Sequence, residues 1–301
     1  CLTVNNAMEI SNVFNRSKNL FPPILKDCSQ RLLVNPLTWV LVVIMLLPCF
    51  LGLWFYYEFS DERQFEEVDG EKVYYGTDGG LLHVELREAF LNLSSLFIVK
   101  FIGVLLAIMF SSELINEEFN RKTMQILRTT PIMSLEIIFY RYVTGVLCMF
   151  GILASSSIIM YIVIMLGSGI HGIIEELEIL WLVIKIVLFE SIAYLGIFCL
   201  ISAYFERPFL LGIVYWIIWE MIVSGTQYQQ ITVSHYLESI LFDGLKNIGL
   251  SVTAEDYGLT KIVNNEVVNI ATEPITAMLV MIGIGLGTVV WGARGLGNRQ
   301  F

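Results

Sequence analysis

Charged residues are scarce in this chain, and six long stretches hold almost none. Asp, Glu, Lys and Arg make up 15% of the 301 residues, whereas 56% are hydrophobic and the mean hydropathy is +0.70. Helices of soluble proteins keep one polar face, and these stretches do not. An ordinary soluble domain is therefore excluded.

Several motifs of catalysis are also missing. The 301 residues contain no G-x-x-x-x-G-K-[ST] nucleotide-binding loop and no G-x-S-x-G nucleophile motif. No histidine falls in an apolar stretch, and no cysteine falls in a connection predicted to lie outside the cell. We therefore predict that the chain is not an enzyme, holds no metal, and has no disulfide framework.

The apolar stretches predict membrane-spanning helices, because about 20 residues of helix cross the ~30 Å hydrocarbon core of a bilayer. The fold class that follows is an all-α polytopic membrane protein with six spans. The predicted spans are Leu37–Tyr57, Leu93–Ser112, Tyr142–Gly167, Ile179–Tyr204, Pro208–Gly225 and Ile275–Gly292.

The distribution of basic residues predicts the orientation of these spans. With both termini in the cytoplasm, 11 Lys and Arg residues lie inside and 5 lie outside, as the positive-inside rule requires. The predicted domains are a cytoplasmic segment 1–36, a six-helix domain 37–292 and a cytoplasmic tail 293–301. The predicted connections of the six-helix domain are 58–92, 168–178 and 226–274 outside the cell and the long connection 113–141 inside.

Three segments outside the spans carry a pattern of their own. Phe21–Val34 predicts an amphipathic helix in the inner membrane interface, and the alternative is a simple linker. Turn residues at Asp69-Gly70 predict a hairpin or excursion in the first outer connection. A helical stripe in 226–274 predicts a helix that covers the outer mouth. That stripe consists of Tyr236, Leu237, Ile240, Leu241, Leu245 and Ile248.

The inner connection 113–141 is charged and still helically patterned up to Thr129-Thr130-Pro131, where proline stops the helix. A short helix with charged flanks and apolar side chains suits docking into a groove of a soluble partner. The alternative is an ordinary solvated loop.

This connection resembles the cytoplasmic loop of the type-2, exporter-like permeases of ABC transporters. The matching residues are Glu117, Glu118, Arg121, Lys122, Thr123, Leu127, Pro131, Ser134 and Glu136. Lys122 stands where the family usually has glycine. The six-span layout, the amphipathic segment before the first span and the inner turn Ala203–Phe209 are also similar to that family.

The resemblance implies a permease subunit in the plasma membrane that exports an amphiphilic or hydrophobic substrate. It implies a second permease copy or paralogue, surrounding lipids and two separate ATPase subunits as partners, without nucleic acid. ATP and Mg would bind to the ATPases, so this chain would need no cofactor. The implied ATPase-coupling residues are Glu117, Glu118, Arg121, Thr123, Met124, Leu127 and Pro131.

Four charged residues lie inside predicted spans, where an ion is costly and generally faces protein or water. Lys100, Lys185 and Glu220 lie one to two turns from the outer surface, where they can form a polar layer or reach the headgroups. Glu190 lies near the midplane, where it can line the pathway, gate it, or form a structural pair. An ion-coupled secondary transporter or channel that uses Glu190 is the alternative function.

The last span contains a G-x-x-x-G pair, Gly283 and Gly287. Small residues at this spacing let two membrane helices approach closely. We therefore predict a helix-packing contact at these two glycines.

Overall fold

The computed structural model describes residues 25–50, 53, 64–68, 71–75, 82–116, 134–226, 228–250, 252–255, 257–263 and 266–298. Helices dominate this part of the chain. The α-helices are α2 (Pro36–Met45), α4 (Leu82–Leu93), α5 (Gly103–Ser111), α8 (Ser134–Met165), α9 (Gly169–Glu175), α10 (Leu177–Tyr204), α11 (Pro208–Tyr215), α12 (Val233–Asn247) and α13 (Pro274–Asn298).

Shorter stretches of tighter or wider helix extend several of these helices. The wider, π-helical stretches are η1 (Ser94–Ile102), η2 (Ser112–Asn116) and η4 (Trp216–Ile222). The tighter, 3₁₀ stretches are η3 (Leu166–Ser168), η5 (Val223–Gly225) and η6 (Gln229–Ile231). As a result, α4, η1, α5 and η2 form one continuous helix, and α11 and η4 form another.

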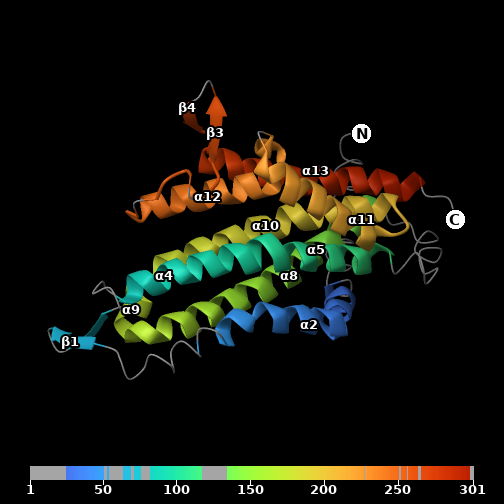
Figure 1. Ribbon diagram of the computed structural model, residues 1–301. Coiled ribbons are helices and arrows are strands. Elements are labelled where there is room, and N and C mark those ends of the chain that lie inside the picture. Colours follow the sequence, from blue (N-terminus) through green and yellow to red (C-terminus); the bar gives the residue numbers. More distant parts are fainter. Residues whose placement is uncertain are drawn as a thin grey trace, which may run out of the picture.

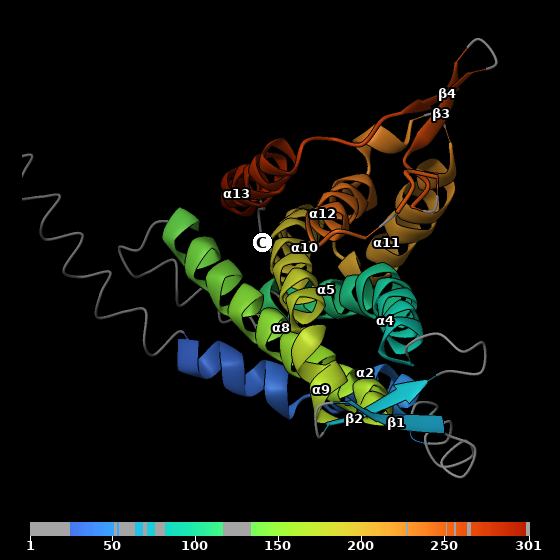
Figure 2. The same ribbon diagram turned by 90° about the vertical axis from the view of Figure 1, so that its left-hand side faces the viewer.

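Helix α10 forms the centre of the bundle. It packs against α13, α8, α5 and α12, and the long helices lie side by side in Figures 1 and 2. The most apolar part of α10 is 67% buried, whereas the corresponding part of α13 is 28% buried. The core therefore lies around α10, and α13 leaves most of its apolar surface uncovered within this chain.

Four described helices are long and apolar enough to cross a membrane: Val84–Ile115, Ile138–Ser168, Leu177–Tyr204 and Pro274–Gly295. A bent pair, Leu25–Val34 with Pro36–Phe50, makes a fifth candidate span, and Pro208–Ile222 is a shorter apolar helix. These helices confirm a multi-pass membrane protein. The count of six spans and the orientation of the termini stay predictions.

The bend of 65° in the first candidate span lies at Asn35. Asn35 caps the next helix, since its side-chain oxygen accepts the Leu37 N–H at 2.9 Å, and Pro36 occupies the first helical position. On the first arm, Cys28 and Leu32 are buried, whereas Leu33 is exposed. A helix with a buried and an exposed side is thus present over Leu25–Val34. Residues 21–24 of the predicted segment lie outside the described residues, and the place of the helix in the membrane interface stays a prediction.

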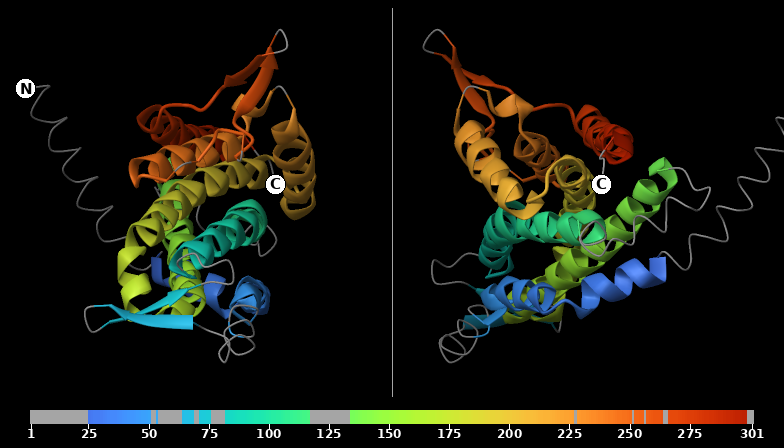
Figure 3. Two further views of the ribbon diagram at one scale, coloured as in Figure 1. Left: turned by 60° about the vertical axis from the view of Figure 1, so that its left-hand side comes forward. Right: turned by 90° about the vertical axis from the view of Figure 1, so that its right-hand side faces the viewer.

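Two small hairpins make the all-α assignment incomplete. Strands β1 (Gln64–Val68) and β2 (Glu71–Tyr75) pair antiparallel on either side of Asp69-Gly70, which confirms the predicted hairpin. Strands β3 (Thr260–Val263) and β4 (Glu266–Asn269) form a second antiparallel pair that was not predicted. Figures 1 and 3 show β3 and β4 projecting from the bundle. The described part of the chain is therefore mostly helical with two hairpins.

Candidate functional site

Two π-helical stretches bring Lys100 and Glu220 to the same region of the bundle. In η1, the Gly103 N–H bonds to the Ile98 carbonyl five residues back, as the wider helix requires. The Lys100 carbonyl instead accepts the Trp216 indole N–H of η4 at 3.1 Å. The rings of Phe101 and Trp216 also meet edge to face, with centroids 5.3 Å apart. This contact fixes η1 against η4.

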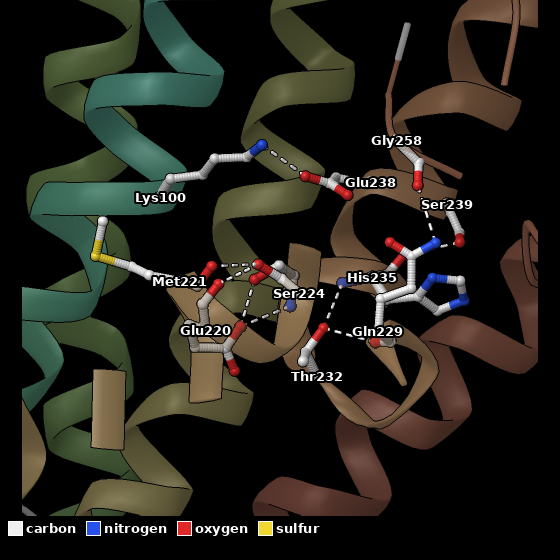
Figure 4. A network of polar contacts seen from close by, with 11 residues as sticks. Lys100, Glu220, Met221, Ser224, Gln229, Thr232, His235, Glu238, Ser239 and Gly258 are labelled. Atoms are coloured by element: carbon white, nitrogen blue, oxygen red, sulfur yellow. Dashed lines mark hydrogen bonds and ion pairs between the residues drawn. The ribbon is translucent and has the colours of Figure 1, made fainter. Parts of the chain in front are cut away.

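The Lys100 ammonium forms an ion pair with Glu238 of α12, at 2.7 Å from the carboxylate oxygen (Figure 4). The Lys100 side chain remains 48% exposed, whereas that of Glu238 is 16% exposed. Burial raises the pKa of the Glu238 carboxyl, and the nearby Lys100 charge opposes that rise. This ion pair therefore links the second candidate span to α12, and Lys100 is its more exposed residue.

Glu220 belongs to η4 and is 6% exposed. Its side chain lies against the amino end of α12. Its carboxylate accepts the Val233 N–H at 3.2 Å and the Ser234 N–H at 3.1 Å, and the Ser234 hydroxyl also donates to it. The Thr232 hydroxyl oxygen accepts the His235 N–H (Figure 4). Since the first N–H groups of a helix have no partner within the helix, these contacts satisfy three of them.

Two cavities meet at these residues. The larger has a volume of about 870 Å³, and we call it the polar chamber. It is lined by Leu91, Asn92, Ser95, Leu96, Lys100, Met221, Ser224, Thr226, Gln229, Glu238, Tyr257, Gly258, Thr260, Lys261 and Ile270. The smaller measures about 490 Å³, and we call it the aromatic chamber. It is lined by Leu96, Phe97, Lys100, Phe101, Tyr194, Trp216, Glu220, Met221, Ser224, Ser234 and Glu238.

Two of the three residues of the predicted polar layer lie close together, and a polar layer within a membrane stays a prediction. Lys100 and Glu220 both line the aromatic chamber, joined by Glu238. The Lys185 side chain is exposed, lines neither chamber and has no ion pair among the described residues. The structure therefore places Lys100 and Glu220 in one site and leaves Lys185 outside it.

Glu190 lies in the middle of α10 and is fully buried. Neither of its carboxylate oxygens has a hydrogen-bond partner among the described residues. A Cβ atom added to Gly103 would lie 1.7 Å from Oε1 of Glu190. Glycine at position 103 therefore provides the space for this carboxyl group between α5 and α10. Glu190 lines neither chamber.

The two glycines of the G-x-x-x-G pair face away from their own bundle. A Cβ atom at Gly283 or Gly287 would meet no atom of the described residues within 4 Å. Gly285 makes the close contact within the chain, since a Cβ atom there would lie 2.5 Å from the Tyr142 hydroxyl and 2.8 Å from the Ile192 carbonyl. A contact of Gly283 and Gly287 with another chain stays a prediction.

The predicted coupling residues all lie outside the described residues. They are Glu117, Glu118, Arg121, Thr123, Met124, Leu127 and Pro131. The helices on either side of them are described. Arg141 of α8 is buried and donates from Nη1 to the Leu114 carbonyl of η2 at 3.0 Å. The two ends of the connection are therefore held together.

Glu238 and Gln229 are the members of the site that sequence reasoning missed. Gln229 donates from Nε2 to the Gly258 carbonyl at 2.9 Å and so fixes the segment that precedes β3. One signal was available for Glu238, since it is an acidic residue beside the apolar stripe of the predicted outer helix. That stripe is confirmed, because Leu237, Ile240, Leu241 and Leu245 are buried in α12.

An apolar helical bundle with several candidate spans and chambers beside them defines a multi-pass membrane protein. The sequence model described as ABC-2 family transporter protein matches residues 24–242, which is more than half of the chain. The chain belongs to this family and is a membrane permease of an ABC transporter. No curated protein matches it significantly.

Proposed function

We propose that this chain forms the transmembrane part of an ATP-driven exporter in the cell membrane, with both termini cytoplasmic. Two separate ATPase chains and a second permease, either a copy or a paralogue, would complete the transporter. The ATPases would bind ATP and Mg. The observation that carries this proposal is the family match over 24–242, since ABC permeases normally work with ABC ATPases.

The contact with the ATPases is proposed for the connection 113–141. A charged segment with apolar side chains between two long helices suits docking into a groove of a soluble protein. The Arg141 bond to the Leu114 carbonyl supports this role, because a force applied to the connection would act on η2 and α8 together. Leu127 and Met124 would supply apolar contacts, and Glu117, Glu118 and Arg121 the charged ones.

The path of the substrate is proposed to pass through the chambers beside Lys100 and Glu220. The polar chamber has a mixed lining that includes two lysines, and the aromatic chamber has a mainly apolar one, so together they suit an amphiphilic molecule. Export is the direction proposed, and it rests on the exporter-like sequence of the inner connection.

Affinity purification from native membranes tests the proposal. We expect a chain with G-x-x-x-x-G-K-[ST] to copurify in stoichiometric amount, and its absence under mild solubilisation would contradict an ATP-driven transporter. Leu127→Ala should reduce the recovered ATPase severalfold. Leu177→Ala is the matched control, because Leu177 is an exposed leucine at the start of α10 and lies outside this connection. Equal ATPase recovery with both variants would remove the coupling role of Leu127.

A second candidate function is an ion-coupled secondary transporter or channel that uses Glu190. The observation in its favour is the buried carboxyl group in the middle of α10, without a partner among the described residues. Transport driven by an ion gradient without ATP, and lost in Glu190→Gln, would support it over the ATP-driven reading.

A further inference from the structure

We propose that the two chambers bind an amphiphile with an acidic headgroup, a carboxylate or a phosphate. The headgroup lies in the polar chamber between Lys100 and Lys261, and the apolar chain lies in the aromatic chamber. This inference rests on the proposed function only where it treats the bound molecule as the substrate.

The charges of the polar chamber favour an anion. Among the described residues that line it, Lys100 and Lys261 are basic and Glu238 is the sole acidic one. Lys261 forms no ion pair within the described part of the chain. A single excess positive charge therefore remains after Lys100 and Glu238 have paired.

The ion pair itself also presents its basic side to a ligand. The Lys100 side chain is 48% exposed and that of Glu238 is 16% exposed. An incoming molecule therefore meets the ammonium before the carboxylate. An ammonium group has three N–H donors, so Lys100 can keep Glu238 and also donate to a ligand oxygen.

Glu220 does not cancel this preference. Although Glu220 lines the aromatic chamber, both of its carboxylate oxygens accept hydrogen bonds from the first residues of α12. The positive end of the helix dipole lies against this carboxylate and offsets its charge. Glu220 is also 6% exposed, so a ligand has little access to it.

The aromatic chamber explains why the ligand is an amphiphile and not a small free anion. Its walls include Phe97, Phe101 and Trp216, and it shares Leu96 and Met221 with the polar chamber. A volume of about 490 Å³ falls in the range of sites that bury apolar ligands. An ion such as phosphate would leave this apolar space unused.

Fluorescence quenching on the full chain in phosphatidylcholine nanodiscs tests the inference. The probes are a fatty acid and a monoacyl phosphate that carry bromine in the acyl chain, with the methyl ester of the same fatty acid as the uncharged control. At alkaline pH both acids are ionised. Bromine quenches nearby indole rings, so a chain in the aromatic chamber should quench Trp216 in a saturable manner.

Two variants assign the signal to the chamber. Trp216→Phe should remove the saturable quenching. Trp219→Phe should leave it in place, because Trp219 does not line either chamber. Saturable quenching that persists in Trp216→Phe would place the bound chain elsewhere and overturn the inference.

Charge variants test the headgroup contact. Lys100→Gln should weaken binding of both acids about tenfold, because a hydrogen bond to a charged group is lost. Lys261→Gln should weaken it about threefold, as expected for a more loosely placed charge. Glu238→Gln should bind the acids as tightly as wild type or more tightly. Lys185→Gln is the matched control and should change nothing, since Lys185 lines neither chamber.

Equal affinity for the acid and its ester would show that the acidic headgroup does not contribute to binding. This comparison uses the wild-type chain, so it holds even if Lys100→Gln does not fold. Displacement of the probes by millimolar inorganic phosphate alone would indicate a site for small anions. A preference for one acid over the other would identify carboxylate or phosphate as the headgroup. Because binding needs no ATPase, failure here is distinct from failure of ATPase copurification.

Discussion

Two buried glutamates of the bundle, Glu220 and Glu190, have opposite surroundings. Glu220 lies at the amino end of α12, where two backbone N–H groups and the Ser234 hydroxyl donate to its carboxylate. Glu190 lies in the middle of α10, and its two oxygens have no partner among the described residues. The first carboxylate joins two elements of the fold, whereas the second occupies a space that a glycine leaves free.

These two residues illustrate how a membrane bundle can keep an acidic side chain in its interior. A buried charge is tolerated where fixed N–H donors and a helix dipole face it, and Glu220 has both. A buried acidic group without donors is expensive as an ion and far cheaper as the neutral acid. We therefore expect a structural role for Glu220, and Glu190 stays the candidate for a pathway or gating role.

The largest effect is expected from Gly103→Ala, which fills the space of the Glu190 carboxyl. The new Cβ atom would lie 1.7 Å from Oε1 of Glu190 and 2.8 Å from the Ile98 carbonyl. Overpacking of this kind costs about 1–3 kcal/mol or more. Thermal unfolding in detergent, followed by size-exclusion chromatography, should show a clearly lower midpoint than wild type.

Gly151→Ala is the control for this experiment, because a Cβ atom at Gly151 meets nothing within 4 Å. Alanine in place of glycine within a helix should leave stability unchanged or raise it by up to about 1 kcal/mol. The double variant Gly103→Ala with Glu190→Ala should recover part of the loss. No recovery would mean that Glu190 is not what Gly103 makes room for.

Glu220→Ala should destabilise the chain by about 1–3 kcal/mol, because the Val233 and Ser234 N–H groups lose a buried acceptor. Glu220→Gln keeps one oxygen acceptor and should lose less. The same thermal assay checks both variants, and Glu178→Ala at an exposed position of α10 is the control. Equal losses for Ala and Gln would show that charge, and not hydrogen bonding, matters at this position.

Ser234→Ala should have a smaller effect, about 1 kcal/mol, because it removes only the hydroxyl donor to Glu220 and leaves the backbone contacts. A double-mutant cycle with Glu220→Ala measures the coupling of the two side chains. Additive losses would contradict the contact between them.

The smallest effect on stability is expected from Glu190→Gln. No hydrogen bond is lost among the described residues, so the free energy of unfolding should stay within about 0.5 kcal/mol of wild type or rise. The transport rate should change nevertheless, since glutamine cannot exchange a proton. A loss of stability as large as that of Glu220→Ala would contradict the difference between the two residues, and unchanged transport would remove Glu190 from the mechanism.

The sequence predicted those features that depend on neighbouring residues. Long apolar runs identified the candidate spans, Asp69-Gly70 identified the first hairpin, and the stripe from Leu237 to Leu245 identified the buried face of α12. The β3–β4 hairpin was overlooked, although Thr260–Val263 and Val267-Val268 are rich in β-branched residues on either side of an Asn pair.

Contacts between distant parts of the chain could not be derived in this way. The pairing of Lys100 with Glu238 depends on where α12 packs against the bundle, which no local pattern reveals. Likewise, Gly103 makes the close approach to Glu190, and Gly285 makes one to α8 and α10, while the recognisable Gly283 and Gly287 pair faces outward. Spacing identifies glycines that can allow close packing, and only the fold decides which ones do.

ATP-dependent transport into inside-out membrane vesicles is the most direct test of ATP-driven export by this chain. Vesicles with this chain and its copurified ATPase should take up the acyl-labelled acid when ATP and Mg are supplied. Uptake should be lost when the ATPase carries an inactive nucleotide-binding loop, and reduced by Lys100→Gln but not by Lys185→Gln. Uptake that continues without ATP and follows an ion gradient would contradict the account and favour a secondary transporter built around Glu190.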